Sequence, residues 1–119
     1  MAKQAEKREV IVNKKPVAVF TEFNNKTNWV AGTVTGLNGK QFTFESKLFD
    51  TGSEYGIKKG RVSCLAISDT VVREAKKNYD DSLIVAYDRG WGKRAKKEDK
   101  SVFDAVMELL ENSPKRFED

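Results

Sequence analysis

The chain contains no histidine, and Cys64 is its only cysteine. Histidine is the usual general base near neutral pH and the commonest zinc ligand, so its absence excludes Ser-His and Cys-His nucleophile pairs and much hydrolase chemistry. A single thiol cannot form an intrachain disulfide, and apolar neighbours are typical of an inert, buried cysteine. We therefore expect no enzymatic activity, no metal and no cofactor. A metal-dependent enzyme based on carboxylates is the most distant alternative.

Long apolar runs are also absent. No stretch of about 18 apolar residues occurs, as a membrane-spanning helix would need, and the polar N-terminus has no secretory signal. The length of 119 residues suits one domain, and the 39% hydrophobic and 34% charged residues favour a folded chain. We expect a cytoplasmic protein with no membrane partner. Its parts would be a flexible N-terminus (1–9), a single domain (10–113) and a C-terminal tail (114–119).

Short runs of β-branched and aromatic residues, separated by turn residues, predict an antiparallel sheet. The clearest turn is Asn38-Gly39, a strong hairpin signal between the runs 29–37 and 40–49. The other runs of this kind are 10–12, 17–20, 61–68 and 83–87. Pro16 lies between the first two, which predicts a hairpin at the edge of the sheet, and the last is apolar enough to be central.

The segment after residue 100 predicts a C-terminal helix. Ser101 and Asp104 have the spacing of a capping box at its start. Segment 69–81 fits either a weak helix or a loop, and 92–100 is expected to have no regular structure. The helix has an apolar stripe made of Val102, Phe103, Val106, Leu109 and Leu110. The predicted fold class is α+β, a single antiparallel sheet of about five or six strands with the helix packed on one face.

Two segments that contain glycine follow predicted strands, at 50–61 and 87–91. We expect glycine at positive φ in both, which would turn the chain and direct side chains outward at a sheet end. The candidate binding residues are Asp50, Ser53, Tyr55, Arg61, Asp88, Arg89 and Trp91. The alternative is structural: local turns, an ion pair of Asp88 with Arg61 or Arg89, and Trp91 over the core edge. Whether the two segments meet is left open.

A basic run follows Trp91, and the whole chain carries a formal net charge of +4. Such a run beside an aromatic residue indicates a contact with the phosphates of nucleic acid. The alternative is an ordinary solvated loop, since Glu98 and Asp99 follow at once. The candidate nucleic-acid contacts are Lys93, Arg94, Lys96 and Lys97.

Several separated motifs resemble those of a known family. They are Phe49-Asp50-Thr51-Gly52-Ser53-Glu54-Tyr55-Gly56-Ile57, Gly60-Arg61-Val62-Ser63 and Tyr87-Asp88-Arg89-Gly90-Trp91. In this order they resemble small uncharacterised proteins carried by phages, prophages and integrative elements of Gram-positive bacteria. The resemblance covers about Trp29 to Leu110 and implies no catalytic residue.

The resemblance implies an accessory protein that acts inside a bacterial host. We expect a non-enzymatic protein that binds a host macromolecule, either nucleic acid or a protein that handles nucleic acid, with counter-defence as one such role. The alternative is a module that sequesters a nucleotide, with Arg61 and Arg89 on phosphate and Tyr55 or Trp91 on the base. Exposed edge strands would also allow a homodimer that extends the sheet.

Overall fold

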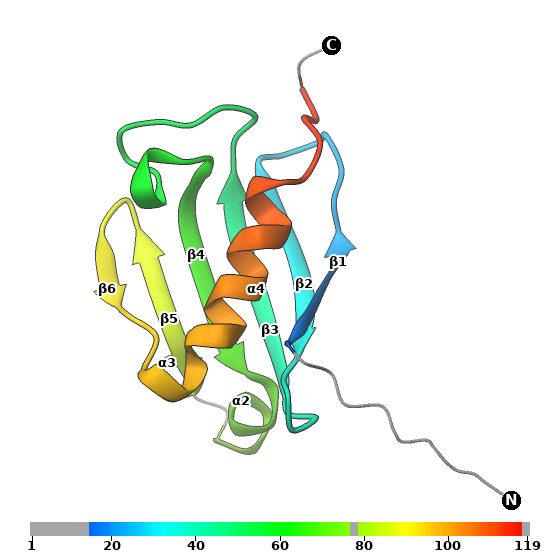
Figure 1. The fold of residues 1–119 in the computed structure, drawn as a ribbon, viewed down its shortest axis with the longest axis vertical. Coiled ribbons are helices and arrows are strands. Elements are labelled where there is room, and N and C mark those ends of the chain that lie inside the picture. Colours follow the sequence, from blue (N-terminus) through cyan, green and yellow to red (C-terminus); the bar gives the residue numbers. More distant parts are fainter. Residues whose placement is uncertain (1–14, 77–78, 118–119) are drawn as a thin grey trace, which may run out of the picture.

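The structure is a computed structural model that describes residues 15–76 and 79–117. Figure 1 shows one antiparallel sheet whose strands are ordered as in the chain, β1-β2-β3-β4-β5-β6. The strands are β1 (Val17–Glu22), β2 (Trp29–Thr35), β3 (Gln41–Leu48), β4 (Val62–Asp69), β5 (Leu83–Asp88) and β6 (Trp91–Lys93). The predicted α+β class with a single antiparallel sheet is confirmed. The predicted flexible segment 1–9 and strand at 10–12 lie outside the described residues.

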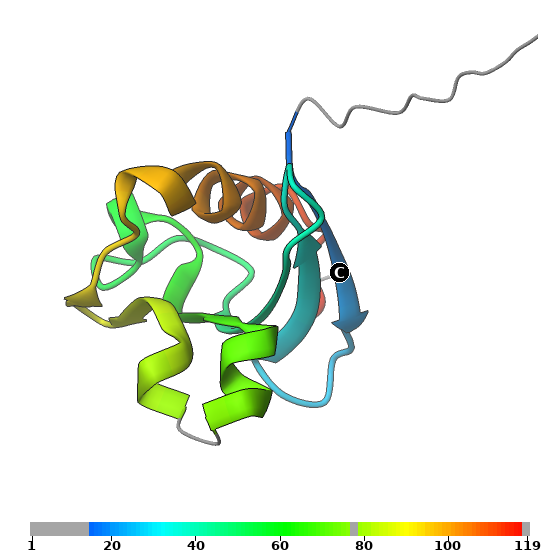
Figure 2. The same cartoon turned by 90° about the horizontal axis from the view of Figure 1, so that it is seen from below.

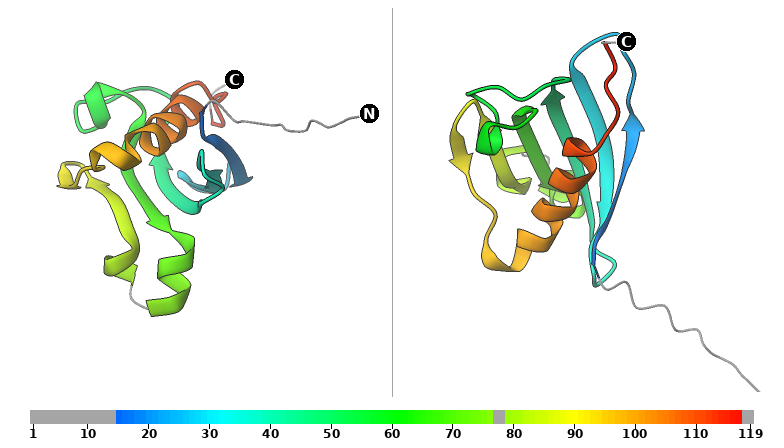
Figure 3. Two further views of the ribbon diagram at one scale, coloured as in Figure 1. Left: turned by 60° about the horizontal axis from the view of Figure 1, so that its bottom comes forward. Right: turned by 45° about the horizontal axis from the view of Figure 1, so that its top comes forward.

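The helices lie on both faces of this sheet. The longest, α4 (Lys100–Glu111), crosses one face, as the sequence predicts. The short helices α2 (Thr70–Lys76) and α3 (Tyr79–Ser82) lie on the opposite face, near one end of the strands (Figure 2). They project away from the sheet and leave much of that face uncovered (Figure 3, left). Two short 3-10 turns, η1 (Ile57–Lys59) and η2 (Lys97–Asp99), precede β4 and α4.

The core lies between α4 and the sheet. Val102, Val106 and Leu110 of the predicted stripe are buried, and each contributes on the order of 1.5 to 3 kcal/mol. Phe44 of β3 is fully buried opposite them, and a Cβ at Gly32 on β2 would overlap its ring. Glycine at that position therefore lets the aromatic ring pack directly against the strand backbone.

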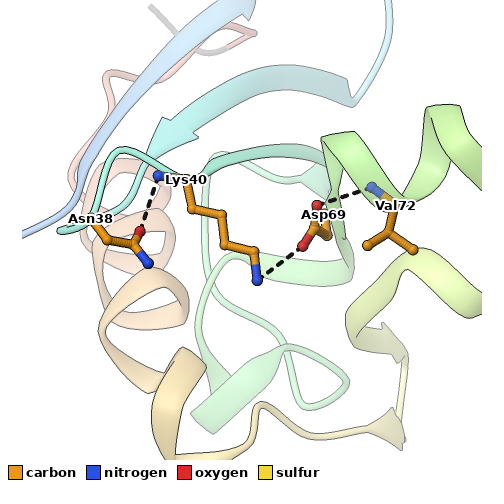
Figure 4. Close-up of polar contacts among 4 residues, drawn as sticks. All are labelled: Asn38, Lys40, Asp69 and Val72. Carbon is orange, nitrogen blue, oxygen red and sulfur yellow. Dashed lines mark hydrogen bonds and ion pairs between the residues drawn. The ribbon is translucent and has the colours of Figure 1, made fainter.

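The Asn38-Gly39 hairpin is confirmed, and its turn is fastened to the rest of the fold. Gly39 has a φ of 83°, and the Lys40 backbone N–H donates to Asn38 Oδ1 at 3.0 Å. Lys40 Nζ lies 3.1 Å from Asp69 Oδ2, and Asp69 Oδ1 accepts from the Val72 backbone N–H at 3.1 Å (Figure 4). Asp69 therefore caps the start of α2 and holds the hairpin turn. Its carboxylate raises the pKa of Lys40.

Two predictions about the segment before α4 are wrong. Residues 91–93 form strand β6 and 97–99 form η2, although no regular structure was expected there. Ser101 does not cap α4, because η2 extends the helix start to Lys100, and Asp104 instead accepts from Lys100 Nζ at 2.8 Å. The 3-10 turn occupies the place of a capping side chain.

Candidate functional site

The two predicted segments meet at one end of the sheet, where the β3–β4 loop approaches the β5–β6 turn (Figure 1). The Tyr87 hydroxyl donates to the Tyr55 carbonyl oxygen at 2.7 Å, and the Arg89 guanidinium carbon lies 4.4 Å from the centroid of the Tyr55 ring. The Arg89 backbone N–H also donates to the Ser63 carbonyl at 2.9 Å. The question that the sequence left open is therefore answered: Tyr55 and Arg89 touch.

A hollow of about 430 Å³ lies beside this contact, and we call it the rim pocket. Its lining residues are Lys47, Phe49, Thr51, Gly52, Ser53, Tyr55, Ser63 and Arg89. The lining holds two cations and two aromatic rings but no carboxylate, and Lys47 Nζ lies 5.7 Å from the Phe49 ring centroid. Neither Lys47 nor Arg89 forms an ion pair with any carboxylate of residues 15–76 and 79–117. The positive charge of both side chains is therefore available to an anion.

The glycines of these segments do not take the conformation that we expected. Positive φ occurs instead at Lys58 (53°), Lys59 (62°) and Arg89 (59°). Gly52 and Gly56 are required for another reason, since a Cβ on either would collide with the backbone of Lys59 or Gly60. The loop is a tightly folded backbone and not a glycine nest for phosphate.

Arg61 is directed away from the rim pocket and holds the end of α4. Its guanidinium donates to the carbonyl oxygens of five residues: Phe49, Leu110, Glu111, Ser113 and Pro114. Its backbone N–H donates to the Glu111 carboxylate at 2.9 Å. A cation at a helix C-terminus satisfies carbonyls that have no partner within the helix. Arg61 is therefore a structural residue, and we remove it from the candidate site.

Asp50 also has a structural partner, in the segment that follows α4. Its two carboxylate oxygens accept the backbone N–H groups of Arg116 and Phe117, each at 2.9 Å. The Arg116 guanidinium donates to the carbonyls of four residues: Asn24, Thr27, Asn28 and Leu48. Residues 114–117 of the predicted tail are thus held against the β1–β2 loop. The sequence analysis missed Arg116, because nothing near it in the chain indicates a partner about ninety residues earlier.

A second hollow, of about 790 Å³, lies on the sheet face opposite α4, and we call it the open-face groove. Trp29, Lys47, Cys64 and Asp88 form one row across its strands, because Trp29 pairs with Lys47, Lys47 with Cys64 and Cys64 with Asp88. The next row contains Glu45, Ala66 and Ala86. Tyr79 of α3 and the backbone at Gly90 and Gly92 also line the groove. Lys47 lines both hollows, so its side chain lies between the groove and the rim pocket.

Cys64 is half-buried on the open face of the sheet, so its predicted burial among apolar residues is wrong. Its thiol donates to Asp88 Oδ1 at 3.2 Å. Burial raises the pKa of this thiol, and the hydrogen bond and charge of Asp88 raise it further. The thiolate, which is the nucleophile, is disfavoured, so Cys64 lines the groove as a small neutral side chain. Asp88 forms no ion pair with Arg61 or Arg89 within the described part of the chain.

Trp91 and the basic run lie mainly toward α4. The Trp91 ring centroid is 5.0 Å from that of Tyr87 and 5.7 Å from that of Phe103, which places it at the edge of the core. Arg94 stacks on Trp91 at 4.5 Å and lines a different hollow, of about 310 Å³, beside α4. Lys93 Nζ donates to the Leu83 carbonyl at 2.6 Å. The basic run is therefore separate from the rim pocket, with Lys96 and Lys97 exposed.

Lys47 and Phe49 belong to the rim pocket, and Trp29 and Tyr79 to the groove, but none of them was a candidate site residue in the sequence. Lys47 falls on the polar side of the alternating run 40–49, which is the one signal that could have placed it on the open face. Its position near Arg89 depends on the strand order, and the sequence does not state that order.

No curated protein and no solved structure matches the chain. Among the residues that the structure describes, no helix is both long enough and apolar enough to cross a membrane. One family model matches residues 28–111, from just before β2 to the last residue of α4. This range covers the rim pocket, the groove and most of the chain. The chain therefore belongs to the family described as a domain of unknown function, DUF7678.

Proposed function

We propose that the protein is a non-enzymatic module that binds nucleic acid by holding a phosphate in the rim pocket. The observation that carries this proposal is the pairing of Lys47 and Arg89 with Tyr55 and Phe49 in a hollow without carboxylates. Arginine binds phosphate oxygens through paired N–H groups, and an aromatic face stacks a base of any sequence. The two functions that a nucleotide unit requires are therefore present side by side.

Charge separates this ligand from the alternatives. A phosphate in the pocket would be the counter-ion that Lys47 and Arg89 do not find in the described part of the chain. An acidic host protein would also satisfy these charges, whereas a nucleotide supplies both the phosphate for the two cations and a base for the Tyr55 and Phe49 rings. The motifs imply a protein of a mobile element. We therefore propose that it binds nucleic acid of the bacterial host, with counter-defence as one outcome.

A small nucleotide is a second candidate ligand, and the size of the rim pocket favours it. A volume of about 430 Å³ lies within the range of small-molecule sites. In this reading the protein would sequester a free nucleotide, with the Arg89 guanidinium on its phosphate. The dimensions of the ligand distinguish the two functions, because a sequestering site gains nothing from additional nucleotides.

Fluorescence anisotropy with a labelled single-stranded oligonucleotide tests the proposal on the full chain. We expect binding to weaken about threefold for each neutralised phosphate between about 50 and 200 mM salt, because counterions are released from that phosphate. Arg89→Ala should reduce the affinity about tenfold or more. Lys15→Ala, which removes an exposed lysine beside Glu108 of α4, is the matched control and should bind as the parent protein does.

Arg94→Ala separates the rim pocket from the basic run. If the rim pocket holds the phosphate, Arg94→Ala keeps most of the affinity that Arg89→Ala loses. The reverse order would assign the contact to the basic run. Binding that neither salt nor Arg89→Ala changes, or capture of an acidic host protein in place of nucleic acid, would contradict the proposal.

A further inference from the structure

We infer that the ligand is single-stranded nucleic acid, with its bases in the open-face groove and its phosphates at the rim pocket. This inference rests on the proposed function and adds the strand state and the base preference. Its basis is the contrast between the two hollows that Lys47 lines. The rim pocket has cations without carboxylates, whereas the groove has carboxylates on a floor of small side chains.

The two hollows provide room for more than one nucleotide. Lys47 lines both, and the turn that contains Arg89 separates them, with Asp88 and Gly90 on the groove side. The groove volume of about 790 Å³ exceeds the volume of about 430 Å³ at the rim. A ligand whose phosphate lies between Lys47 and Arg89 would therefore extend its neighbouring nucleotide into the groove.

The charges of the groove select bases over phosphates. Glu45 and Asp88 line it, and Lys47 is its only cationic lining residue, at the end shared with the rim pocket. A phosphate beside two carboxylates would be repelled, whereas a carboxylate accepts hydrogen bonds from the exocyclic amino group of cytosine. The same chemistry serves the amino group of adenine. Thymine carries no exocyclic amino group, so we expect weaker binding of thymine.

Aromatic side chains border this groove on separate elements. Trp29 on β2 is 50% exposed, and Tyr79 on α3 is 37% exposed. The Tyr79 hydroxyl lies 3.5 Å from Glu45 Oε1, and the Arg73 guanidinium stacks on the ring of Tyr79 at 4.8 Å. The groove is also lined by Ala66 and Ala86, whose small side chains leave space for a flat ring. Exposed rings above a shallow floor suit the stacking of unpaired bases.

A duplex cannot use this groove. Its bases are stacked inside the helix and present only their edges, so they cannot stack on Trp29 or Tyr79. The rim pocket alone would still contact the phosphates of a duplex. We therefore expect the affinity of the duplex, per contacted phosphate, to be about as low as that of a mononucleotide. The single strand should bind more tightly than either.

The experiment compares four fluorescently labelled ligands on the full-length protein: a mononucleotide, oligo-dC, oligo-dT and a duplex of mixed sequence. We expect oligo-dC to bind about tenfold more tightly than the mononucleotide and the duplex. Oligo-dT should bind between these limits, because thymine stacks on the rings but has no amino group for the carboxylates. Trp29→Ala should weaken the binding of oligo-dC about tenfold and leave mononucleotide binding unchanged. Leu37→Ala, which truncates an exposed apolar side chain of the β2–β3 turn, is the matched control. Glu45→Gln keeps the size of the side chain and should reduce the preference for oligo-dC over oligo-dT.

The outcomes separate this inference from the proposed function. If oligo-dC binds no better than the mononucleotide and Trp29→Ala changes nothing, the inference is overturned while the rim pocket stands. If the duplex binds as tightly as oligo-dC, the inference is also overturned. If Arg89→Ala leaves binding of every ligand unchanged, the proposed function fails. Thermal melting of each variant shows whether a loss of binding reflects a loss of the fold.

Discussion

Two pairs of basic side chains at the same end of the sheet have opposite surroundings. Arg61 and Arg116 are directed into the fold and donate to backbone carbonyls of loops, strand ends and the end of α4. Lys47 and Arg89 line the rim pocket, and neither forms an ion pair with a described carboxylate. Arginine is therefore not by itself a sign of a binding site. Its role depends on whether carbonyl groups surround it.

This contrast explains why one candidate residue was retained and another was removed. The last turn of a helix has carbonyl groups that find no hydrogen-bond donor within the helix. A guanidinium with several N–H groups can satisfy many of them at once. Arg61 does this at the end of α4. Arg89 has a φ of 59° in the β5–β6 turn, and its guanidinium stacks on the Tyr55 ring. An aromatic ring orients the guanidinium without neutralising its charge.

The largest effect is expected from Arg61→Ala. The substitution leaves the carbonyls at the end of α4 without their cation, so we expect a loss of about 3 kcal/mol in the free energy of unfolding. The melting temperature should fall by about 10 to 20 °C. Arg61→Lys should recover less than half of the loss, because lysine has no planar fork. If the free energy of unfolding of Arg61→Ala lies within about 0.5 kcal/mol of the parent value, the contrast between structural and binding cations is contradicted.

Arg116→Ala should have the next largest effect. Its guanidinium joins the segment after α4 to the β1–β2 loop and to Leu48, and we expect a loss of about 2 kcal/mol in urea denaturation. Arg73→Ala is a matched control, since Arg73 is exposed and stacks on Tyr79. It should change stability by less than about 0.5 kcal/mol. Equal losses for Arg116→Ala and Arg73→Ala would show that the carbonyl contacts are not the cause.

The rate at which Cys64 is alkylated reports the electrostatic effect of Lys47 on this thiol. Burial and Asp88 raise the pKa of this thiol, whereas the charge of Lys47 lowers it. Alkylation near pH 8 should therefore be slower than for a free thiol, slower again in Lys47→Ala and faster in Asp88→Asn. Because the pKa is raised on folding, the associated stability is present below the pKa of the unfolded thiol. It is lost as the pH rises through the pKa of the folded state. Faster alkylation in Lys47→Ala would contradict the picture of a free cation beside the thiol.

The smallest effect on stability is expected from Arg89→Gly. The substitution removes the stacking on Tyr55, worth about 0.5 to 1 kcal/mol at an exposed site, but it also relieves the left-handed backbone conformation at residue 89. The two terms nearly cancel, so the melting temperature should change by no more than a few degrees. Nucleic acid binding should nevertheless be lost. A large destabilisation would instead place Arg89 with the structural arginines.

Local patterns in the sequence predict the sheet well. The alternation of Phe42, Phe44 and Leu48 and the Asn38-Gly39 turn define the β2–β3 hairpin, because both depend on neighbouring residues alone. The stripe of α4 is equally local. Strand β6 was missed because its three residues are too few to show a period, and the 3-10 turn before α4 replaced the expected capping box.

The candidate site was predicted only in part, for reasons that involve distance along the chain. Tyr55, Ser53 and Arg89 line the rim pocket, as the glycine-containing segments indicated, but Lys47 joins them only because β3, β4 and β5 are adjacent. Asp50 and Arg61 were misread, since their partners near the end of the chain lie more than forty residues away. The sequence shows which groups are charged, and the strand order decides which of them find a partner.

The strand order also has a consequence for synthesis on the ribosome. Each strand pairs with the one made just before it, so the sheet can grow one strand at a time as the chain emerges. The helix that covers it, and the guanidinium of Arg116 that reaches back to the β1–β2 loop, are translated after all six strands. The apolar face of the growing sheet therefore stays uncovered until α4 has left the exit tunnel.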